Sequence, residues 1–440
     1  MRLRPVGGNC SIMREAKAVI GKNFGDEGKG QTVDFLCRGR HALVVRHNGG
    51  AQAGHTVEEG DFRFVFHQLG SGSRQGCPTF WSRTFLPDLF KLGEEMEAYR
   101  TVSDTIRLSN PAQNICASPV STAYADPRCA CTTIYDVLLN SLTEQLRGKD
   151  KHGSCGMGIY ETLLRTRTSP YGLFLQDFQQ TDADGILQKL LNIREHYTKA
   201  RLAELQAAYP RRFQDPEIRR WVDLMEDDNL PYNAAHIMCE NFHNYVIPAD
   251  WPQMATQYDT IIFENAQGLL LDWDNEEYSP HLTASHTGLK NVAELLRELQ
   301  DCREASHPTN SLLPDSMEVI YVSRSYVTRH GAGRLDYECA KEDINPEMTD
   351  RTNLPNPWQD ALRYARHPAG EDFFRYIRKD LTHLETLSLP CLVTLSLTHL
   401  NETPGRILFA DQDRSPEALL AYCEEQAPGL IGSIRTDLDL

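Results

Sequence analysis

The sequence lacks an apolar run long enough to cross a membrane. None of its 440 residues belongs to an apolar stretch approaching the roughly 18–20 residues that a bilayer-spanning helix needs. Positive charge is also in short supply, because 45 Lys and Arg stand against 61 Asp and Glu, for a formal net charge of -16. An acidic chain binds nucleic acid and anionic membranes poorly. We therefore expect a cytoplasmic protein with no nucleic-acid or membrane partner.

Cysteines at zinc-site spacing are absent as well. The 12 cysteines include one Cys-x-Cys pair, Cys129 and Cys131, but no Cys-x-x-Cys. A chain of this length does not need disulfides for stability, so we expect buried, reduced thiols. Residues 1–12 lack the apolar segment of a secretory signal. We expect them to be a disordered extension, or a start assigned too early, with residues 13–440 forming one domain.

What the sequence does contain is a regular series of short apolar runs, several of them continuous rather than alternating. Continuous runs are typical of strands buried on both faces of a mostly parallel sheet. They lie at 16–20, 41–47, 259–264, 318–324 and 391–397. Helix-like stretches at 185–208 and 286–301 separate them, and the polar stretches 303–317 and 345–358 have the composition of surface excursions. The pattern predicts an α/β fold with a mostly parallel central sheet and helices on both faces.

The most unusual local stretch is GKNFGDEGKG at 21–30, between an apolar run and a helix-like segment. Strand, glycine-rich loop and helix in this order can surround a phosphate with backbone N–H groups. The loop is not a Walker A motif, because Asn23 and Gly30 stand where that motif needs Gly and Ser or Thr. Taken alone, it could equally be a helix N-terminus with a solvated charged first turn.

Four more glycine-rich polar segments follow, and open α/β sheets bind ligands at the ends of their strands. They are HNGGAQAGHT (47–56), HGSCGMG (152–158), FENAQGLLLDWD (263–274) and TRHGAG (328–333). His55 alone would more often be a structural histidine. Together, Asp26, Lys29 and His55 offer a carboxylate base, a cation for a transferring phosphate and an imidazole donor.

These segments closely resemble the signature segments of the adenylosuccinate synthetase family, in the same order and at comparable spacing. The resemblance rests on NFGDEGKGQTVDFLC, VVRHNGGAQAGHTV, HQLGSG (67–72), GSCGMG (153–158), FENAQGLLLDWD, YSPHLTASHT (278–287) and SYVTRHGAG (325–333). It covers nearly the whole chain and implies a single α/β domain related to P-loop NTPases. It also implies a ligase that forms a C–N bond.

The resemblance implies a mechanism and a set of site residues. In that family an Asp takes the N1 proton of IMP, the 6-oxygen attacks the γ-phosphate of GTP, and aspartate then displaces phosphate. Mapped onto this chain, Asp26, His55, Lys29 and Gln267 would be catalytic, and Asp26 with the Gly54 carbonyl would bind Mg²⁺. Nucleotide or substrate contacts would come from Gly25, Glu27, Gly28, Gly30, Asn48, Gly49, Gln52, Ala53, Thr56, Ser154, Cys155, Asn265, Thr283, Arg329, Gly331, Arg351 and His399. A homodimer is also implied.

The departures from the family pattern fall on recognition rather than on chemistry. Gln52, Cys155 and Met157 replace an Asn, a Thr and an Arg, the first two of which help to hold the 5′-phosphate of IMP in the family. Arg165 or Arg167 could supply the arginine that the partner subunit normally contributes. His399 stands where an Asp reads guanine, and 350–367, with Arg351, replaces the aspartate-binding loop.

Because the phosphoryl-transfer residues are kept, we interpret the chain as an active enzyme with altered substrates. The phosphoryl donor could be ATP or GTP. The purine could be of the IMP type or of the guanine type, as in 2-aminoadenylosuccinate synthetases, and the amine could be aspartate or another amino acid. A purine-nucleotide sensor without turnover is the alternative from another class, while an ordinary P-loop NTPase is disfavoured by the failed Walker A motif.

Overall fold

The structure is a computed structural model that describes residues 13–109, 122–148, 156–302, 312–348 and 362–436. Residues 1–12 and most of the stretches 303–317 and 345–358 lie outside this part of the chain, so the predictions made for them stay predictions. Within the described residues, no helix has the length and apolarity needed to cross a membrane.

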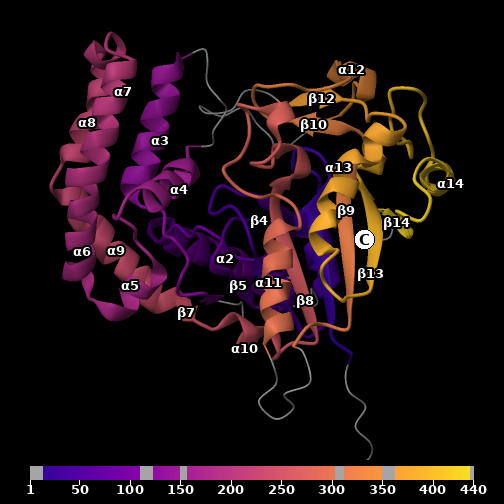
Figure 1. Ribbon diagram of the computed structural model, residues 1–440, viewed down its shortest axis with the longest axis horizontal. Coiled ribbons are helices and arrows are strands. Elements are labelled where there is room, and N and C mark those ends of the chain that lie inside the picture. Colours follow the sequence, from indigo (N-terminus) through magenta and orange to yellow (C-terminus); the bar gives the residue numbers. More distant parts are fainter. Residues whose placement is uncertain (1–12, 110–121, 149–155, 303–311, 349–361, 437–440) are drawn as a thin grey trace, which may run out of the picture.

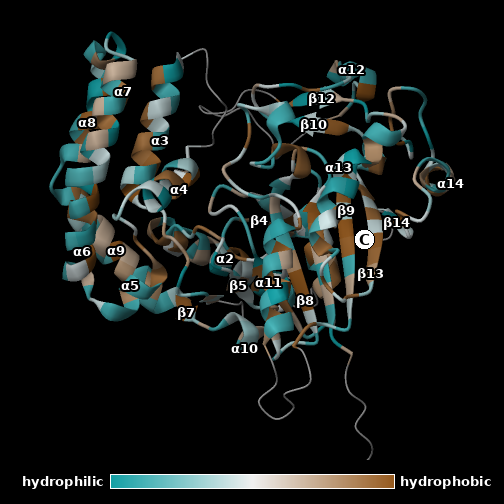
Figure 2. Ribbon diagram, in the orientation of Figure 1, coloured by the Kyte–Doolittle hydropathy of each residue, from teal (hydrophilic) through white to brown (hydrophobic). Residues whose placement is uncertain are grey.

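A nine-stranded sheet forms the centre of the molecule, and every pair of neighbouring strands in it is parallel. In spatial order the strands are β14 (Ser433–Thr436), β13 (Cys391–Thr398), β9 (Ser316–Arg324), β1 (Glu15–Gly21), β8 (Thr260–Gly268), β2 (Ala42–Arg46), β5 (Thr79–Trp81), β6 (Ala123–Ala125) and β7 (Val246–Pro248). All five apolar runs predicted to be strands are strands of this sheet. Figure 2 shows the brown, hydrophobic colour continuing along β8, β9 and β13.

Helices cover both faces of the sheet, as predicted. On one face, Val19 and Val44 pack against α1 (Lys29–Cys37). On the other, Ala18 and Ile20 pack in the cluster that holds α10 (Trp251–Ala255), α11 (Lys290–Asp301), α13 (Glu371–Leu381) and α14 (Pro416–Gln426). Successive residues of β1 thus point to opposite faces and both are buried, which explains the continuous apolar pattern.

A helical region stands beside the sheet, at the left of Figure 1. It contains α3 (Ile134–Arg147), α4 (Ile159–Thr168), α5 (Leu175–Gln180), α6 (Ala183–Asn192), α7 (Lys199–Ala208), α8 (Pro216–Glu226) and α9 (Asn229–Tyr245), and α2 (Leu89–Ser109) packs on α9. The helix predicted over 185–208 is α6 and α7 joined by a π-helical turn at Ile193–Thr198. The one predicted over 286–301 begins later, at Lys290, because Thr287 is bonded to Asp272 through its N–H.

Two small sheets and a short helix complete the fold. β3 (His55–Glu59) and β4 (Phe62–Phe66) form an antiparallel hairpin. β10 (Val327–Arg329), β12 (Arg363–Ala365) and β11 (Glu338–Cys339) form a three-stranded antiparallel sheet near α12 (Lys341–Ile344). Among the described cysteines none is paired and six are buried, but Cys391 is exposed at the first position of β13, where burial was predicted.

The register brings the carboxyl ends of the central strands to one edge. Gly21 at the end of β1 is level with Gly268 of β8 and with Val322 of β9. β2 ends beside Glu264 of β8. The polar segments that follow these strands therefore emerge together, as expected for ligand sites in open α/β sheets.

Candidate active site

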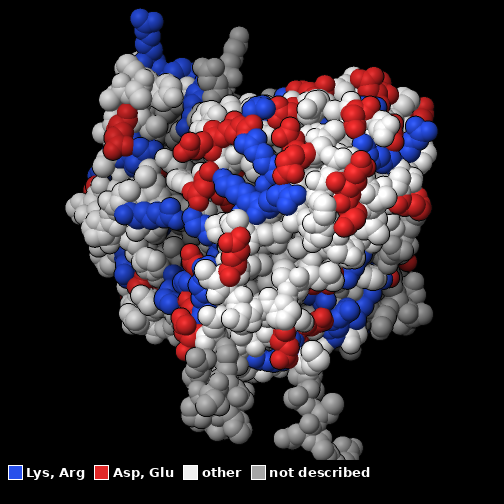
Figure 3. Space-filling view, turned by 45° about the vertical axis from the view of Figure 1, so that its right-hand side comes forward, with Lys and Arg blue, Asp and Glu red and all other residues white. Residues whose placement is uncertain are grey.

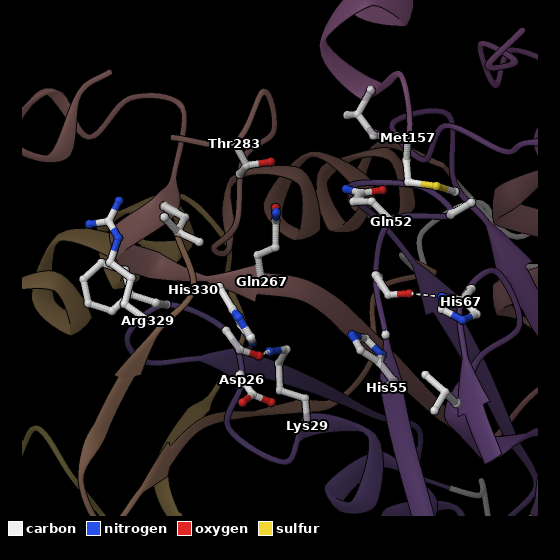
Figure 4. Close-up of a pocket in the computed structure, with 18 of the residues that line it drawn as sticks. Asp26, Lys29, Gln52, His55, His67, Met157, Gln267, Thr283, Arg329 and His330 are labelled. Atoms are coloured by element: carbon white, nitrogen blue, oxygen red, sulfur yellow. Dashed lines mark hydrogen bonds between the residues drawn. The ribbon is translucent and has the colours of Figure 1, made fainter. Parts of the chain in front are cut away.

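A large cavity of about 1900 Å³ lies where these segments meet. Figure 4 shows Asp26, Lys29 and His55 around its centre, with Gln52 and Met157 at one end and Arg329 on the opposite wall. Predicted site residues that line it are Gly25, Asp26, Glu27, Gly28, Lys29, Gly30, Gln52, Ala53, Gly54, His55, Thr56, Gln267, Thr283, Arg329 and His399. The structure thus brings most of the predicted set to a single space.

The glycines of the β1–α1 loop are required by its geometry. Gly25 has φ of +108°, and a Cβ there would lie 2.5 Å from the Cα of Gln267. Gly28 caps α1 with φ of +83° in the left-handed region. Glycine adopts such conformations without the steric cost that a side chain adds. The loop can therefore pass close to β8.

Lys29 lies at the first position of α1 with its side chain buried along this loop. Its ammonium donates to the carbonyl of Gly25. Burial lowers the pKa of Lys29, although the nearby charges of Glu27 and Asp26 raise it. The ammonium is thus held at the loop, where a phosphate could replace the carbonyl as its partner.

Glu27 has a structural function in the same loop. Its Oε1 accepts hydrogen bonds from the Asn23 N–H (2.7 Å) and from the Asn23 amide (2.8 Å). Burial raises the pKa of Glu27, with Lys29 and the bonds from Asn23 acting against it. Oε1 thus fixes the shape of the loop, whereas Oε2 is buried and has no hydrogen-bond partner in the described structure.

Asp26 is bound by an arginine from the neighbouring strand. Arg324, at the end of β9, places Nη2 2.5 Å from Asp26 Oδ2 and Nε 2.6 Å from the Asp26 carbonyl. Arg324 is 4% exposed and also contacts Tyr326 OH at 2.8 Å. Arg324 was not among the predicted site residues, although it ends an apolar run that was predicted to be a strand.

His55 is held by a buried glutamate from β8. Its Nδ1 lies 2.6 Å from Glu264 Oε1, and Glu264 also accepts bonds from the N–H and the hydroxyl of Ser71. Burial alone would raise the pKa of Glu264, but His55, Arg46 and Ser71 bring it down to about 2. Burial lowers the pKa of His55 to about 4, against the attraction of Glu264.

The contact with Glu264 assigns the tautomer of His55. An ionised carboxylate can only accept, so Nδ1 carries the hydrogen and donates a hydrogen bond to Glu264. Nε2 then has no hydrogen-bond partner among the described residues and is available to a ligand. Glu264 was not predicted as a site residue, although it lies in FENAQG, which the sequence analysis singled out.

Three further predicted residues that line the cavity, Gln267, Arg329 and His399, have unusual backbone or pack on aromatic rings. Gln267 has φ of +69°, and its buried Oε1 has no hydrogen-bond partner in the described structure. Arg329 lies over the ring of Phe24, 4.6 Å from its centroid, and donates to the His281 carbonyl at 3.0 Å. His399, with φ of +60°, has its Nδ1 2.9 Å from Thr398 Oγ1.

Four predicted residues lie behind the cavity rather than on its surface. The Asn48 amide binds both the N–H and the carbonyl of Ala266, at 2.8 and 2.9 Å. Gly49 donates its N–H to Ser285 Oγ, and the Asn265 amide donates to the Thr287 carbonyl. Asn48, Gly49 and Asn265 thus join the β2 and β8 ends to each other and to nearby loops, while Gly331 accepts a bond from Arg363. Ser154, Cys155 and Arg351 lie outside the described residues.

Comparisons with known proteins place this geometry in a family. The family model described as adenylosuccinate synthetase matches residues 18–353. The chain belongs to the adenylosuccinate synthetase family. It is accordingly a ligase that forms a C–N bond, and the resemblance and the fold class predicted from the sequence are both confirmed.

Curated adenylosuccinate synthetases resemble the chain at modest identity. That of Lactobacillus gasseri is 26% identical over 371 residues, covering 81% of this chain and 75% of its own. That of Streptomyces coelicolor is 28% identical over 394 residues, covering 85% and 78%. The match therefore runs along most of both chains.

Two solved structures share the fold. Fully ligated adenylosuccinate synthetase from Plasmodium falciparum superimposes with a TM-score of 0.57 at 20% identity, over 89% of this chain and 79% of that one. Succinoaminodeoxyadenylate synthetase of cyanophage S-2L, bound to dGMP and to dATP as an energy donor, gives 0.53 at 13% identity, over 96% and 91%.

The structure decides between the two arginines considered for the partner's site. Arg165 is fully buried, and its guanidinium binds both carboxylate oxygens of Asp136, at 2.9 and 2.7 Å. It cannot reach another subunit without breaking this pair. Arg167 is exposed, 5.9 Å from the ring centroid of Trp273, and is the candidate that stays open.

The two atoms predicted to bind Mg²⁺ suit that ion chemically. Asp26 offers carboxylate oxygen and Gly54 a backbone carbonyl, and both residues line the cavity. Mg²⁺ prefers oxygen ligands and usually binds one or two carboxylates together with substrate phosphates. The bond between Asp26 and Arg324 engages one of the two carboxylate oxygens.

Proposed function

We propose that this chain phosphorylates the 6-oxo group of an IMP-like purine with a nucleoside triphosphate and then couples an amino acid, aspartate first among them, to C6. The observation that carries the proposal is the convergence of Asp26, Lys29 and His55 on one cavity. These residues supply a base, a fixed cation and an imidazole to the same space.

The first step uses the Asp26 carboxylate as the base. It removes the N1 proton of the purine while the 6-oxygen attacks the γ-phosphorus. The bond between the γ-phosphorus and the β–γ bridging oxygen breaks, and a nucleoside diphosphate leaves. Lys29 and the N–H groups of the β1–α1 loop offset the charge of the transferring phosphoryl group. Bound Mg²⁺, held by Asp26 and the Gly54 carbonyl, would neutralise further phosphate charge.

The second step replaces the phosphorylated oxygen by nitrogen. The amine of the amino acid attacks C6, the C–O bond breaks, inorganic phosphate leaves, and the nitrogen loses a proton to solvent or to a site base. Phosphorylation is needed because an amide-type oxygen is a poor leaving group and phosphate is a good one. His55, held by Glu264, is placed to donate through Nε2 to the γ-phosphoryl oxygens once their negative charge favours its protonation.

The surroundings of His399 bear on which base the phosphoryl donor carries. His399 has its Nδ1 on Thr398, whose hydroxyl donates to the Glu27 carbonyl at 3.0 Å. A histidine fixed in this way does not offer the two acceptors that an aspartate gives to guanine. This supports ATP over GTP. The dATP named with the cyanophage structure makes deoxy donors a further choice to test.

The decisive experiment measures phosphate release in a matrix of substrates. It combines ATP, dATP or GTP with IMP, GMP or their deoxy forms, with and without aspartate, in the presence of Mg²⁺. We expect release with ATP and one purine that depends on the amino acid. Activity only with GTP, IMP and aspartate would show that the chain uses the family's ordinary substrates. Tight nucleotide binding without release under any combination would favour a purine sensor.

The Asp26→Asn variant tests the mechanism within that matrix. Asn keeps the size of the side chain but cannot accept the N1 proton, so we expect phosphate release to fall to background with the best substrates. Calorimetric titration of the triphosphate checks that binding persists. Turnover by the variant at the wild-type rate would rule out Asp26 as the base.

A further inference from the structure

Three segments far apart in the sequence meet at the end of the cavity where Figure 4 shows Gln52 and Met157. A Cβ on Gly50 would lie 2.2 Å from the Leu86 carbonyl and 2.8 Å from Ile159 Cδ1. The Leu86 N–H donates to the Gly49 carbonyl at 2.8 Å. The loop after β2, the segment leading into α2 and the start of α4 therefore form one wall.

Two polar side chains in this wall have unused binding capacity. Both polar atoms of the Gln52 amide are buried and have no hydrogen-bond partner in the described structure. Lys91, in the first turn of α2, places its ammonium 3.5 Å from the sulfur of Met157. A thioether is only a weak acceptor, so both groups are poorly satisfied.

No carboxylate among the described residues lies within ion-pair distance of Lys91, because the acidic groups around it have other partners. Glu95 accepts the N–H groups of residues 67–69. Glu144 pairs with Arg147, and Glu161 with Arg201 at 2.9 Å. The Asp88 carboxylate accepts the backbone N–H of Lys91 at 3.2 Å, and the charge of Lys91 lowers the pKa of Asp88 against the effect of burial, but the two side chains form no ion pair. The Lys91 ammonium therefore has no ion-pair partner among the described residues.

Gln52 stands where the family has an Asn that helps to hold the 5′-phosphate of IMP, and we propose that Lys91 is a further residue that binds this phosphate, which makes Lys91 a specificity residue for nucleotides over nucleosides. This inference rests on the proposed function. An ammonium and an amide N–H both donate to phosphate oxygens. The wall lies at the end of the cavity away from Arg329, with Asp26 and Lys29 drawn between the two ends and His55 below Gln52. A purine held over the catalytic centre could thus extend its ribose phosphate toward Lys91.

The test compares Lys91→Met with the wild type on a purine nucleotide and on the matching nucleoside. A hydrogen bond to a charged group is worth roughly 1.5–3 kcal/mol, so we expect KM for the nucleotide to rise roughly 10- to 100-fold. We expect kcat and the parameters for the nucleoside to stay near wild type, and Lys91→Arg to restore much of the loss. Arg100→Met, on the exposed face of the same helix, is the matched control.

The outcomes separate this inference from the proposed function. An active enzyme whose nucleotide KM is unchanged by Lys91→Met would overturn the role of Lys91 and leave the ligase proposal intact. An equal rise of KM for the nucleotide and the nucleoside would also overturn it, since Lys91 would then not contact the phosphate. If the wild type showed no turnover, the Kd of the 5′-monophosphate and of the nucleoside, measured by calorimetry on both variants, would still decide.

Discussion

At the scale of single residues, the contact between His55 and Glu264 determines which ring nitrogen of His55 stays available to a ligand in the cavity. Glu264 is fully buried and accepts from His55 and twice from Ser71. Its negative charge both fixes the tautomer and favours protonation of the imidazole when the triphosphate binds. Glu264 is therefore a positioning residue that acts through His55.

Glu264→Gln should lower kcat by roughly 10²–10³ and change KM for the triphosphate much less. Both neighbours of this side chain, His55 Nδ1 and the Ser71 N–H, are donors. The NH₂ group of a glutamine would therefore face another donor on one side or the other. Steady-state kinetics over pH check the prediction, because loss of the charge should also move the pH at which the rate falls. Ser71→Ala, which removes one neutral donor, is the control. Unchanged kcat in Glu264→Gln would contradict a role through His55.

Residue patterns predicted part of this site and missed part for a physical reason. Asp26, Lys29 and His55 stand out because each follows a strand in a glycine-rich segment. Arg324 contacts Asp26 across 298 positions of sequence, and Glu264 contacts His55 across 209. A local sequence pattern does not reveal contacts at such separations. Lys91 sits in an ordinary amphipathic helix, so only its place against Met157 distinguishes it.

At the scale of secondary-structure elements, Asp380 ties three of them together. From α13 it accepts the Leu289 N–H, just before α11, at 2.7 Å and the Tyr321 hydroxyl of β9 at 2.9 Å. Burial raises the pKa of Asp380 from 3.8 to about 7, with these two bonds acting against the shift. The folded protein thus holds a proton on Asp380 at pH values where the unfolded chain has lost it.

The pKa of Asp380 predicts a pH dependence of stability. Its contribution is complete below about pH 4 and decreases as the pH rises to about 7, with a slope of up to about 1.4 kcal/mol per pH unit. Asp380→Asn does not titrate, so its stability relative to the wild type should increase across this range and then level off. Urea unfolding of both proteins from pH 4 to 8 measures the difference. A constant difference would contradict the raised pKa.

Strands were predicted more accurately than helix ends because their signal is stronger. Burial on both faces gives β1, β2, β8, β9 and β13 continuous apolar runs. The start of α11 is set instead by the bond from Thr287 to Asp272, which no periodicity encodes. The short strands β5, β6 and β7, of three residues each, have too little pattern to be recognised.

At the scale of the whole molecule, the prediction of a homodimer implies that two chains share a site. Charged side chains of both signs are interspersed over the face in Figure 3, so charge does not single out an interface there. Of the two arginines considered for this role, Arg167 is exposed and could enter a partner's cavity, whereas Arg165 is buried and paired with Asp136. We propose a homodimer in which Arg167 does so.

Mixing two inactive variants tests this arrangement. Arg167→Ala and Asp26→Asn should each abolish or strongly reduce activity as homodimers. In a mixed dimer one site would combine the intact Asp26 of one chain with the intact Arg167 of the other. Random exchange should therefore restore about a quarter of wild-type activity. No restoration after verified exchange, shown by tagged pull-down, would mean that the sites are not shared.

The order of the sheet has a consequence for how such an enzyme can change. Arg324 and Glu264 lie on β9 and β8, and Asp26 lies in the loop after β1, which runs between these two strands. His55 begins β3, at the end of the loop that leaves the next strand, β2. Lys91, Met157 and His399 come from outside that group. Under the proposed mechanism, the reacting groups and the side chains that would contact the substrate phosphate and the base of the donor thus come from different elements. Such a division would allow recognition to be exchanged, by evolution or by engineering, around a constant reaction.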